Sequence, residues 1–272
     1  MGWTVRPDTV RPGTARPGTA RPDTARPASA AVRLERVPSL VLAVHGSSVP
    51  GAASALGRLC DRVEELGGVR PVLGHLDHQN PSLTEALRDG AVVVPLLLGD
   101  GYHRTVDIPA VVRSHEGRCV LTDGLSGDRA VALALRDRLH EAERRAGVRA
   151  DAVVLAAAGS SRPGGNGGAR IAVRQLRRLL RGVPVCGAYC SSAGPTVAEA
   201  VARLRGAGYR KVAVAAHLLA PGRFTAALAG AGADAVADPI ADHPEIAGLV
   251  LRRYEAALHR PGGPVVRFGA AA

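Results

Sequence analysis

The sequence carries one short pattern twice. Residues 40–48 read LVLAVHGSS and residues 153–161 read VVLAAAGSS. After each copy, short apolar runs alternate with longer stretches in which apolar residues recur every three or four positions. The short runs are typical of buried strands, and the three-to-four spacing is typical of amphipathic helices. Strands that alternate with helices indicate βαβ units and a parallel sheet, so the chain is expected to build this arrangement twice.

The alternation predicts eight strands and eight helices. The expected strands are residues 41–44, 69–76, 91–98, 118–121, 152–157, 183–189, 211–218 and 233–236. The expected helices are residues 53–66, 81–87, 106–114, 128–145, 168–180, 195–204, 222–228 and 244–258. The predicted fold class is α/β: two tandem, similar, doubly wound domains with parallel sheets and a cleft between them.

The predicted domains leave a tail at each end. We expect an N-terminal domain at residues 39–147 and a degenerate copy at 150–259, each of about 110 residues, an ordinary domain size. Residues 1–38 hold an Arg/Pro/Thr repeat with Pro at every fifth position, which opposes both helix and sheet, so this tail is expected to be disordered. Residues 260–272 are expected to be flexible.

The charge balance points to an anionic partner. The chain has 35 basic and 24 acidic residues, a formal net charge of +11. The Arg-rich tail is either a nucleic-acid or membrane arm, or else a solvated segment or a misassigned start. The lack of interleaved aromatic residues favours the second interpretation. No apolar run reaches the roughly 18 residues of a membrane span, and no secretory signal precedes the first domain. We therefore expect a cytoplasmic protein with reduced cysteines.

Two histidines are candidate ligands at one edge of the first sheet. His45 follows the first strand, and His103 follows the third strand after a glycine-containing turn. Ligands bind beyond the carboxyl ends of parallel strands, where neighbouring strands bring such residues together. The second repeat has Ala158 and Phe224 in the matching places, so both histidines are absent there together. That joint absence favours a single site over two unrelated loop histidines.

Three segments resemble the sirohydrochlorin chelatases. They are VHGS at residues 44–47, LDHQNPS at 76–82 and VPLLLGDGYHRTVDIP at 94–109, and the resemblance extends over about residues 39–258. These are class II chelatases of the cobaltochelatase or ferrochelatase type, here in an actinobacterial-like form. The resemblance implies insertion of Co²⁺, Fe²⁺ or Ni²⁺ into a polycarboxylate tetrapyrrole without ATP or another nucleotide. It also implies that His45 and His103 bind the metal and help to remove protons from the macrocycle.

Three further residues near these segments have two interpretations each. Many relatives carry Glu where this chain has Asp77, which is either a shorter acid that helps to bind the metal or a turn residue. Ser47 and Ser48 precede a helix and either offer hydroxyl and N–H groups to a substrate anion or cap the helix.

Asp107 lies four residues after His103 and either caps the next helix or orients His103. Gly101 and Tyr102, next to His103, are candidate substrate contacts. So is His217, at the end of the third strand of the second repeat. The other histidines on predicted helices are expected in solvent: His115, His140, His243 and His259.

Two other classes of function stay open on the sequence alone. A non-catalytic carrier of the same fold would bind metal or tetrapyrrole through the same histidines without accelerating insertion. A nucleic-acid-binding protein would use the Arg-rich tail, with a strong salt dependence. For the chelatase, no membrane and no nucleic acid are expected as partners. A fused pair of domains does not require an oligomer.

Overall fold

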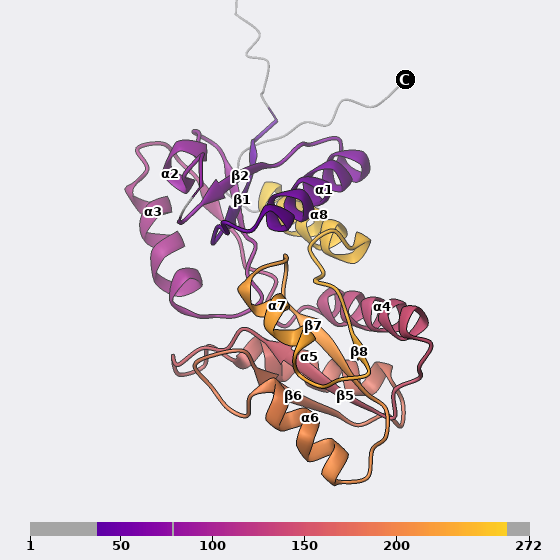
Figure 1. Ribbon diagram of the computed structural model, residues 1–272. Coiled ribbons are helices and arrows are strands. Elements are labelled where there is room, and N and C mark those ends of the chain that lie inside the picture. Colours follow the sequence, from indigo (N-terminus) through magenta and orange to yellow (C-terminus); the bar gives the residue numbers. More distant parts are fainter. Residues whose placement is uncertain (1–36, 78, 260–272) are drawn as a thin grey trace, which may run out of the picture. The chain divides into compact units, whose positions relative to one another are not determined.

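The computed structural model describes residues 37–77 and 79–259, which form two four-stranded parallel sheets (Figure 1). The first sheet has the order β2-β1-β3-β4, and the second repeats it as β6-β5-β7-β8. The strands are β1 (Leu40–Val44), β2 (Val72–His75), β3 (Val92–Pro95), β4 (Val120–Leu121), β5 (Ala152–Ala157), β6 (Val185–Tyr189), β7 (Val212–His217) and β8 (Ala235–Val236). The predicted α/β fold class with two parallel sheets is confirmed. The predicted tails lie, apart from residues 37 and 38, outside the described residues, and the domain boundaries remain predictions.

Helices connect these strands in chain order. They are α1 (Pro50–Gly67), α2 (Leu83–Ala86), the π-helical turn η1 (His103–Asp107), α3 (Ile108–Ser114), α4 (Arg129–Ala146), α5 (Gly167–Leu179), α6 (Val197–Gly206), α7 (Arg223–Ala229) and α8 (Pro244–Leu258). In the part of the chain described, no helix combines the length and apolar character needed to cross a membrane.

The predicted helix at residues 81–87 is wrong over much of its length. Only Leu83–Ala86 is helical, and the Asn80–Pro81 peptide bond before it is cis. Ser82 ends the loop as the N-cap, and Glu85 completes a capping box by accepting from the Ser82 backbone N–H. The cap residue has extended backbone geometry, so the helix begins only after it. The second repeat has the same device at the start of α6, after a cis Gly194–Pro195 bond.

Two further predictions need correction, one about the start of a helix and one about the exposure of a histidine. The helix expected at residues 106–114 begins three residues earlier, as η1, which places His103 in its first turn. His243 was expected in solvent but is buried, and its Nδ1 accepts a hydrogen bond from the Glu245 N–H at the start of α8. A helix N-terminus leaves N–H groups without partners inside the helix, and a buried side chain there satisfies one of them.

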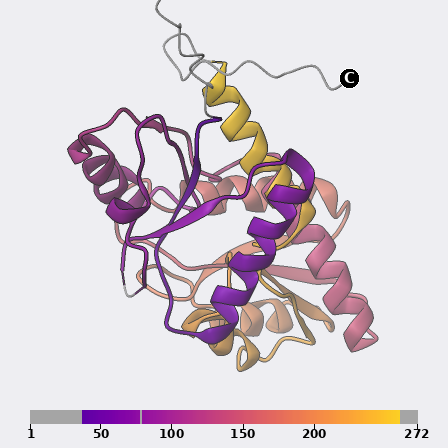
Figure 2. The same cartoon turned by 90° about the horizontal axis from the view of Figure 1, so that it is seen from above.

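The last helix of each repeat packs on the sheet of the other repeat. Helix α8 contacts α1 and β3 of the first repeat, and α4 contacts α5, β7 and β8 of the second. Figures 1 and 2 both show the yellow α8 beside the indigo α1. Helices α1 and α8 approach closely at Gly67, where a Cβ atom would collide with the Leu251 side chain. This exchange was not predicted, because helical periodicity shows that a face is apolar but not which sheet covers it.

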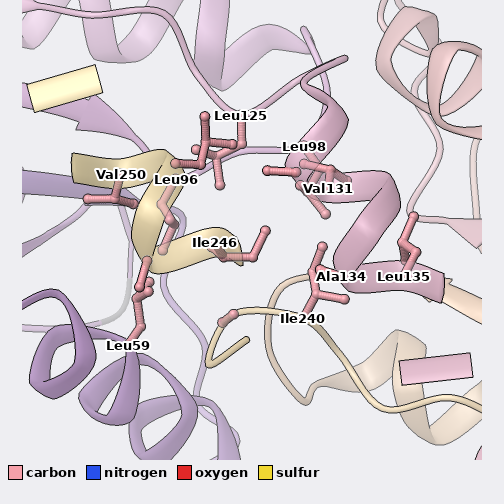
Figure 3. Close-up of a cluster of buried hydrophobic side chains, with 14 of the residues drawn as sticks. Leu59, Leu96, Leu98, Leu125, Val131, Ala134, Leu135, Ile240, Ile246 and Val250 are labelled. Atoms are coloured by element: carbon pink, nitrogen blue, oxygen red, sulfur yellow. The ribbon is translucent and has the colours of Figure 1, made fainter. Parts of the chain in front are cut away.

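One hydrophobic core runs through both repeats as a result. Figure 3 shows Leu59 of α1, Leu135 of α4 and Ile246 of α8 in the same cluster. Beside it, Asp242 accepts hydrogen bonds from Arg58 at 2.7 Å and from Arg138 at 2.6 Å. Burial alone would raise the pKa of Asp242, but the two guanidinium groups lower it below its usual range. The two repeats are therefore joined by packing and by ion pairs.

Candidate functional site

The structure brings His45, Asp77 and His103 into one cluster. Each offers a ligand atom, and these atoms lie within 4.8 Å of one another. The two imidazole ring centroids are 4.5 Å apart, with an interplanar angle of 36°. Strands β1 and β3 are hydrogen-bonded neighbours and β2 pairs with the other side of β1, so the loops that follow all three strands meet at one edge. This is the juxtaposition that the strand order of such sheets favours.

Backbone contacts hold His45 beside Asp77. The Asp77 N–H donates to the His45 carbonyl at 3.0 Å, and the two side chains lie 3.5 Å apart from Nδ1 to Oδ2. Gly46 has φ +100°, and its Cα faces the Asp77 carbonyl oxygen so closely that a Cβ atom would overlap it. The Ser47 N–H donates to Gln79 Oε1 at 3.2 Å and ties the same two loops together. Both loops are therefore positioned by contacts that leave the His45 and Asp77 side chains about half exposed.

Asp107 orients His103 and does not cap a helix. Its Oδ2 lies 2.7 Å from His103 Nδ1, one helical turn away, and the carboxylate makes no capping hydrogen bond. A His103 Nδ1–H that donates to this carboxylate leaves Nε2 with the free lone pair. Of the two interpretations of Asp107, the structure favours the partner of His103.

This donor set suits a divalent first-row transition ion. Imidazole nitrogens combined with a carboxylate are common ligands of such ions, and the described cluster supplies three side chains. Catalytic metal sites commonly have three protein ligands and keep a position open, whereas closed sites with four are structural. Partial solvent exposure of all three side chains leaves an entry path for the ion.

A cavity of about 410 Å³ lies beside His103, between the two repeats. Such a volume is within the roughly 300–1,000 Å³ of small-molecule sites. The first repeat contributes one wall with Leu97, Leu98, Gly99, Gly101, Tyr102, His103 and Arg104. The second contributes Ala157, Ala158, Gly159, Ser160, Ser161, Gly165, Asn166, Ala169, Ser192, His217, Leu218 and Leu219. Gly101, Tyr102 and His217, singled out from the sequence, are all among these lining residues.

His217 is the most deeply buried polar group of this lining. Its side chain is 4% exposed, and its Nε2 has no hydrogen-bond partner among the described residues. Burial lowers the pKa of His217 to about 4, so the imidazole is neutral at neutral pH.

The two serines after β1 lie outside the cavity lining. The Ser47 hydroxyl accepts from the Val49 N–H at 3.2 Å, and α1 starts without any side-chain cap. Ser47 also lies near Gly222 of the second repeat, where a Cβ atom would be 3.9 Å from its hydroxyl oxygen. The structure thus brings Ser47 to the boundary between the repeats and leaves Ser48 exposed.

Two arginines at or next to the cavity were not singled out from the sequence. Arg104 lines the cavity, and its Nη2 is 3.5 Å from Asp123. The guanidinium carbon of Arg162 lies 5.9 Å from the centre of the Tyr102 ring and so joins the two repeats beside His103. Because 34 of the 35 basic residues are Arg, residue type gave no signal.

The sequence matches the CbiX family twice, over residues 39–142 and over residues 152–257. The chain belongs to the CbiX family. The two CbiX segments coincide with the two sheets, and the His45–Asp77–His103 cluster lies in the first. Among curated proteins, none matches the chain.

Solved structures share this CbiX-family fold. SirB from Bacillus subtilis with Fe³⁺ is 22% identical, with a TM-score of 0.63 over 80% of this chain and 95% of that one. The sirohydrochlorin chelatase SirB from Bacillus subtilis subspecies spizizenii in complex with cobalt is 20% identical, with a TM-score of 0.64 over 84% and 98%. CbiX described as the terminal enzyme of siroheme biosynthesis in denitrifying bacteria is 17% identical, with a TM-score of 0.61 over 81% and 99%. At these identities the likeness is one of fold.

Proposed function

We propose that this CbiX-family protein is a chelatase that inserts a divalent metal ion, Co²⁺ or Fe²⁺, into sirohydrochlorin or a related polycarboxylate tetrapyrrole without ATP. The observation that carries the proposal is the cluster of His45, Asp77 and His103 at the edge of a cavity between the repeats. Similar folds occur in a SirB with Fe³⁺ and in a sirohydrochlorin chelatase with cobalt, which supports a metal ion as one substrate.

The incoming ion would be held by the two imidazoles with help from the Asp77 carboxylate. Three ligands from the protein leave coordination positions for water and then for pyrrole nitrogens, so the ion can be passed on. Insertion releases two pyrrole protons, which the imidazole and carboxylate groups accept as the ion leaves them for the pyrrole nitrogens. His45, Asp77 and His103 therefore serve both as ligands and as bases in this proposal, with Asp107 fixing the His103 ring.

The cavity walls would bind the macrocycle. Leucine and alanine side chains from both repeats pack against the flat ring, and Gly101 lets the backbone approach it. Arg104 and Arg162 would bind the peripheral carboxylates, because a guanidinium donates two parallel hydrogen bonds to a carboxylate. Both repeats contribute walls, so one chain is sufficient and no oligomer is required. The proposal assigns the reaction to the cytoplasm.

An absorbance time course tests the proposal. Sirohydrochlorin is mixed with Co²⁺, Fe²⁺ or Ni²⁺, with and without the protein, and the metal that gives the largest acceleration is the preferred substrate. His45→Ala and His103→Ala are expected to abolish the acceleration while leaving the circular dichroism spectrum unchanged. His140→Ala, which removes an exposed histidine of α4, is the matched control.

Two results would overturn the proposal. Unchanged insertion rates in both His45→Ala and His103→Ala would exclude the metal cluster as the site. Cobalt binding without insertion above the spontaneous rate would identify a carrier in place of an enzyme.

A further inference from the structure

His217 has a buried nitrogen that the fold leaves unsatisfied. It is the last residue of β7, and its Nε2 has no partner within the described part of the chain. A buried polar atom without a hydrogen bond destabilises a fold, so such an atom calls for an explanation. Among the described residues the other buried histidines are His75 and His243, and both have hydrogen-bond partners.

The first repeat shows what packing alone prefers at this position. Leu40 of β1 is equivalent to Val153 of β5, and these residues pair with Val92 and Ala213. Val92 of β3 is therefore equivalent to Ala213 of β7, and the rest of the two strands corresponds in the same register. In that register, the residue of the first repeat equivalent to His217 is Leu96, which is 2% exposed. A leucine therefore fills the equivalent position without any polar group, and the histidine is not required to complete the core.

The surroundings of His217 select an uncharged partner. It lines the cavity together with Ala157, Leu218 and Leu219, and it is not a member of the metal-ligand cluster. Burial lowers the pKa of His217, which favours the neutral ring. A neutral imidazole in an apolar wall offers a lone pair and an N–H, which match an uncharged donor or acceptor better than a carboxylate.

We propose that His217 hydrogen-bonds to the pyrrole nitrogens of the tetrapyrrole bound in the cavity and so fixes the macrocycle against the second repeat. This inference rests on the proposed function, because it takes a tetrapyrrole as the occupant. The peripheral carboxylates of that substrate are charged and belong with Arg104, Arg162 and solvent. The ring nitrogens are the uncharged polar groups of the flat apolar part, which is the part that an apolar cavity accepts.

The test separates binding of the macrocycle from binding of the metal. Sirohydrochlorin is titrated without metal into wild type, His217→Leu and His217→Gln, followed by absorbance. Co²⁺ alone is titrated into the same proteins, and urea unfolding gives their midpoints. His243→Asn is the matched control. It replaces another buried histidine, which lies outside the cavity lining, with a residue that can also cap a helix.

His217→Leu is expected to weaken sirohydrochlorin binding about ten-fold, the loss of one buried hydrogen bond. Its Co²⁺ affinity should stay unchanged and its urea midpoint should not fall, because Leu96 shows that leucine fits. His217→Gln keeps a hydrogen-bonding group and should recover part of the affinity. His243→Asn should leave sirohydrochlorin binding unchanged.

Equal sirohydrochlorin affinity in wild type and His217→Leu would overturn the inference. So would an equal loss of Co²⁺ affinity, which would place His217 at the metal. If His217→Leu does not fold, His217→Gln alone decides. No detectable sirohydrochlorin binding by His217→Gln would contradict the inference, and partial retention of binding would support it. Failure of wild type to insert metal would refute the chelatase but not this contact, which is measured without metal.

Discussion

Removing the Asp107 carboxylate should weaken metal binding through His103. In the structure Asp107 Oδ2 lies 2.7 Å from His103 Nδ1, and no other role of this carboxylate at the helix end is present. Asp107→Ala frees the ring to rotate and to adopt the tautomer with its proton on Nε2, where the lone pair is needed for the ion. The expected result is a lower affinity for Co²⁺ with an unchanged fold.

The size of the effect follows from the exposure of the pair. Carboxylate partners of ligating histidines typically contribute about 10–100-fold in metal affinity, or about 1.4–2.7 kcal/mol. The His103 and Asp107 side chains are 41% and 33% exposed, so water can replace part of the lost hydrogen bond. We therefore expect the lower end of the range, about ten-fold, for Asp107→Ala. Asp107→Asn keeps an acceptor oxygen and should lose less.

A double-mutant cycle measured by calorimetric titration with Co²⁺ checks the mechanism. If Asp107 acts through His103, Asp107→Ala should have little further effect once His103→Ala is present. Asp123→Ala is the control for net charge, because it removes an exposed carboxylate that pairs with Arg104 and not with His103. The reasoning fails if Asp107→Ala binds Co²⁺ as wild type does, if Asp123→Ala weakens binding equally, or if the two losses in the cycle simply add.

Two further predictions concern the stability of the fold. Gly46 has φ +100°, and Gly46→Ala would place a Cβ atom on the Asp77 carbonyl oxygen. This variant should lower the free energy of unfolding by about 1–3 kcal/mol and abolish Co²⁺ binding. The control Gly57→Ala, inside α1, should raise the free energy of unfolding by about 1 kcal/mol or less. Urea unfolding and Co²⁺ titration of both variants decide this, and equal behaviour would contradict it. Because the pKa of His217 falls from 6.5 to about 4 on folding, the unfolded chain binds a proton between these values that the folded chain does not. Stability should therefore fall as the pH decreases through this window, by up to about 1.4 kcal/mol per pH unit, and His217→Leu should reduce that slope in urea unfolding series. An identical slope in His217→Leu would refute this, since the part due to His243, whose pKa burial also lowers, is common to both proteins.

The periodicity of the sequence was sufficient for the two sheets but not for the ends of the elements. The β5 and α8 ranges were predicted as observed: the apolar run of β5 begins directly after Asp151, and Pro244 lies in the first turn of α8. The helix at 81–87 was wrong at both ends because Ser82 is its N-cap and Leu87 already has extended backbone geometry. The start of η1 was missed because a π-helical turn has no apolar spacing of its own.

The candidate site was predictable where strand order decides it. His45 and His103 each follow a strand, and the neighbouring positions of β1 and β3 bring them together. Asp77 joins them because β2 flanks β1 on the other side. The contribution of Arg162 was beyond reach, because it depends on how the second repeat lies against Tyr102, and that packing is set by tertiary contacts of both repeats.

The crossing of α8 to the first sheet has a consequence for synthesis on the ribosome. Domains generally fold as units in the order in which they are made. Here β3 is made early, but α8, which packs against it, is made after every other element described. The side of β3 that α8 covers therefore stays exposed until the second repeat has been made.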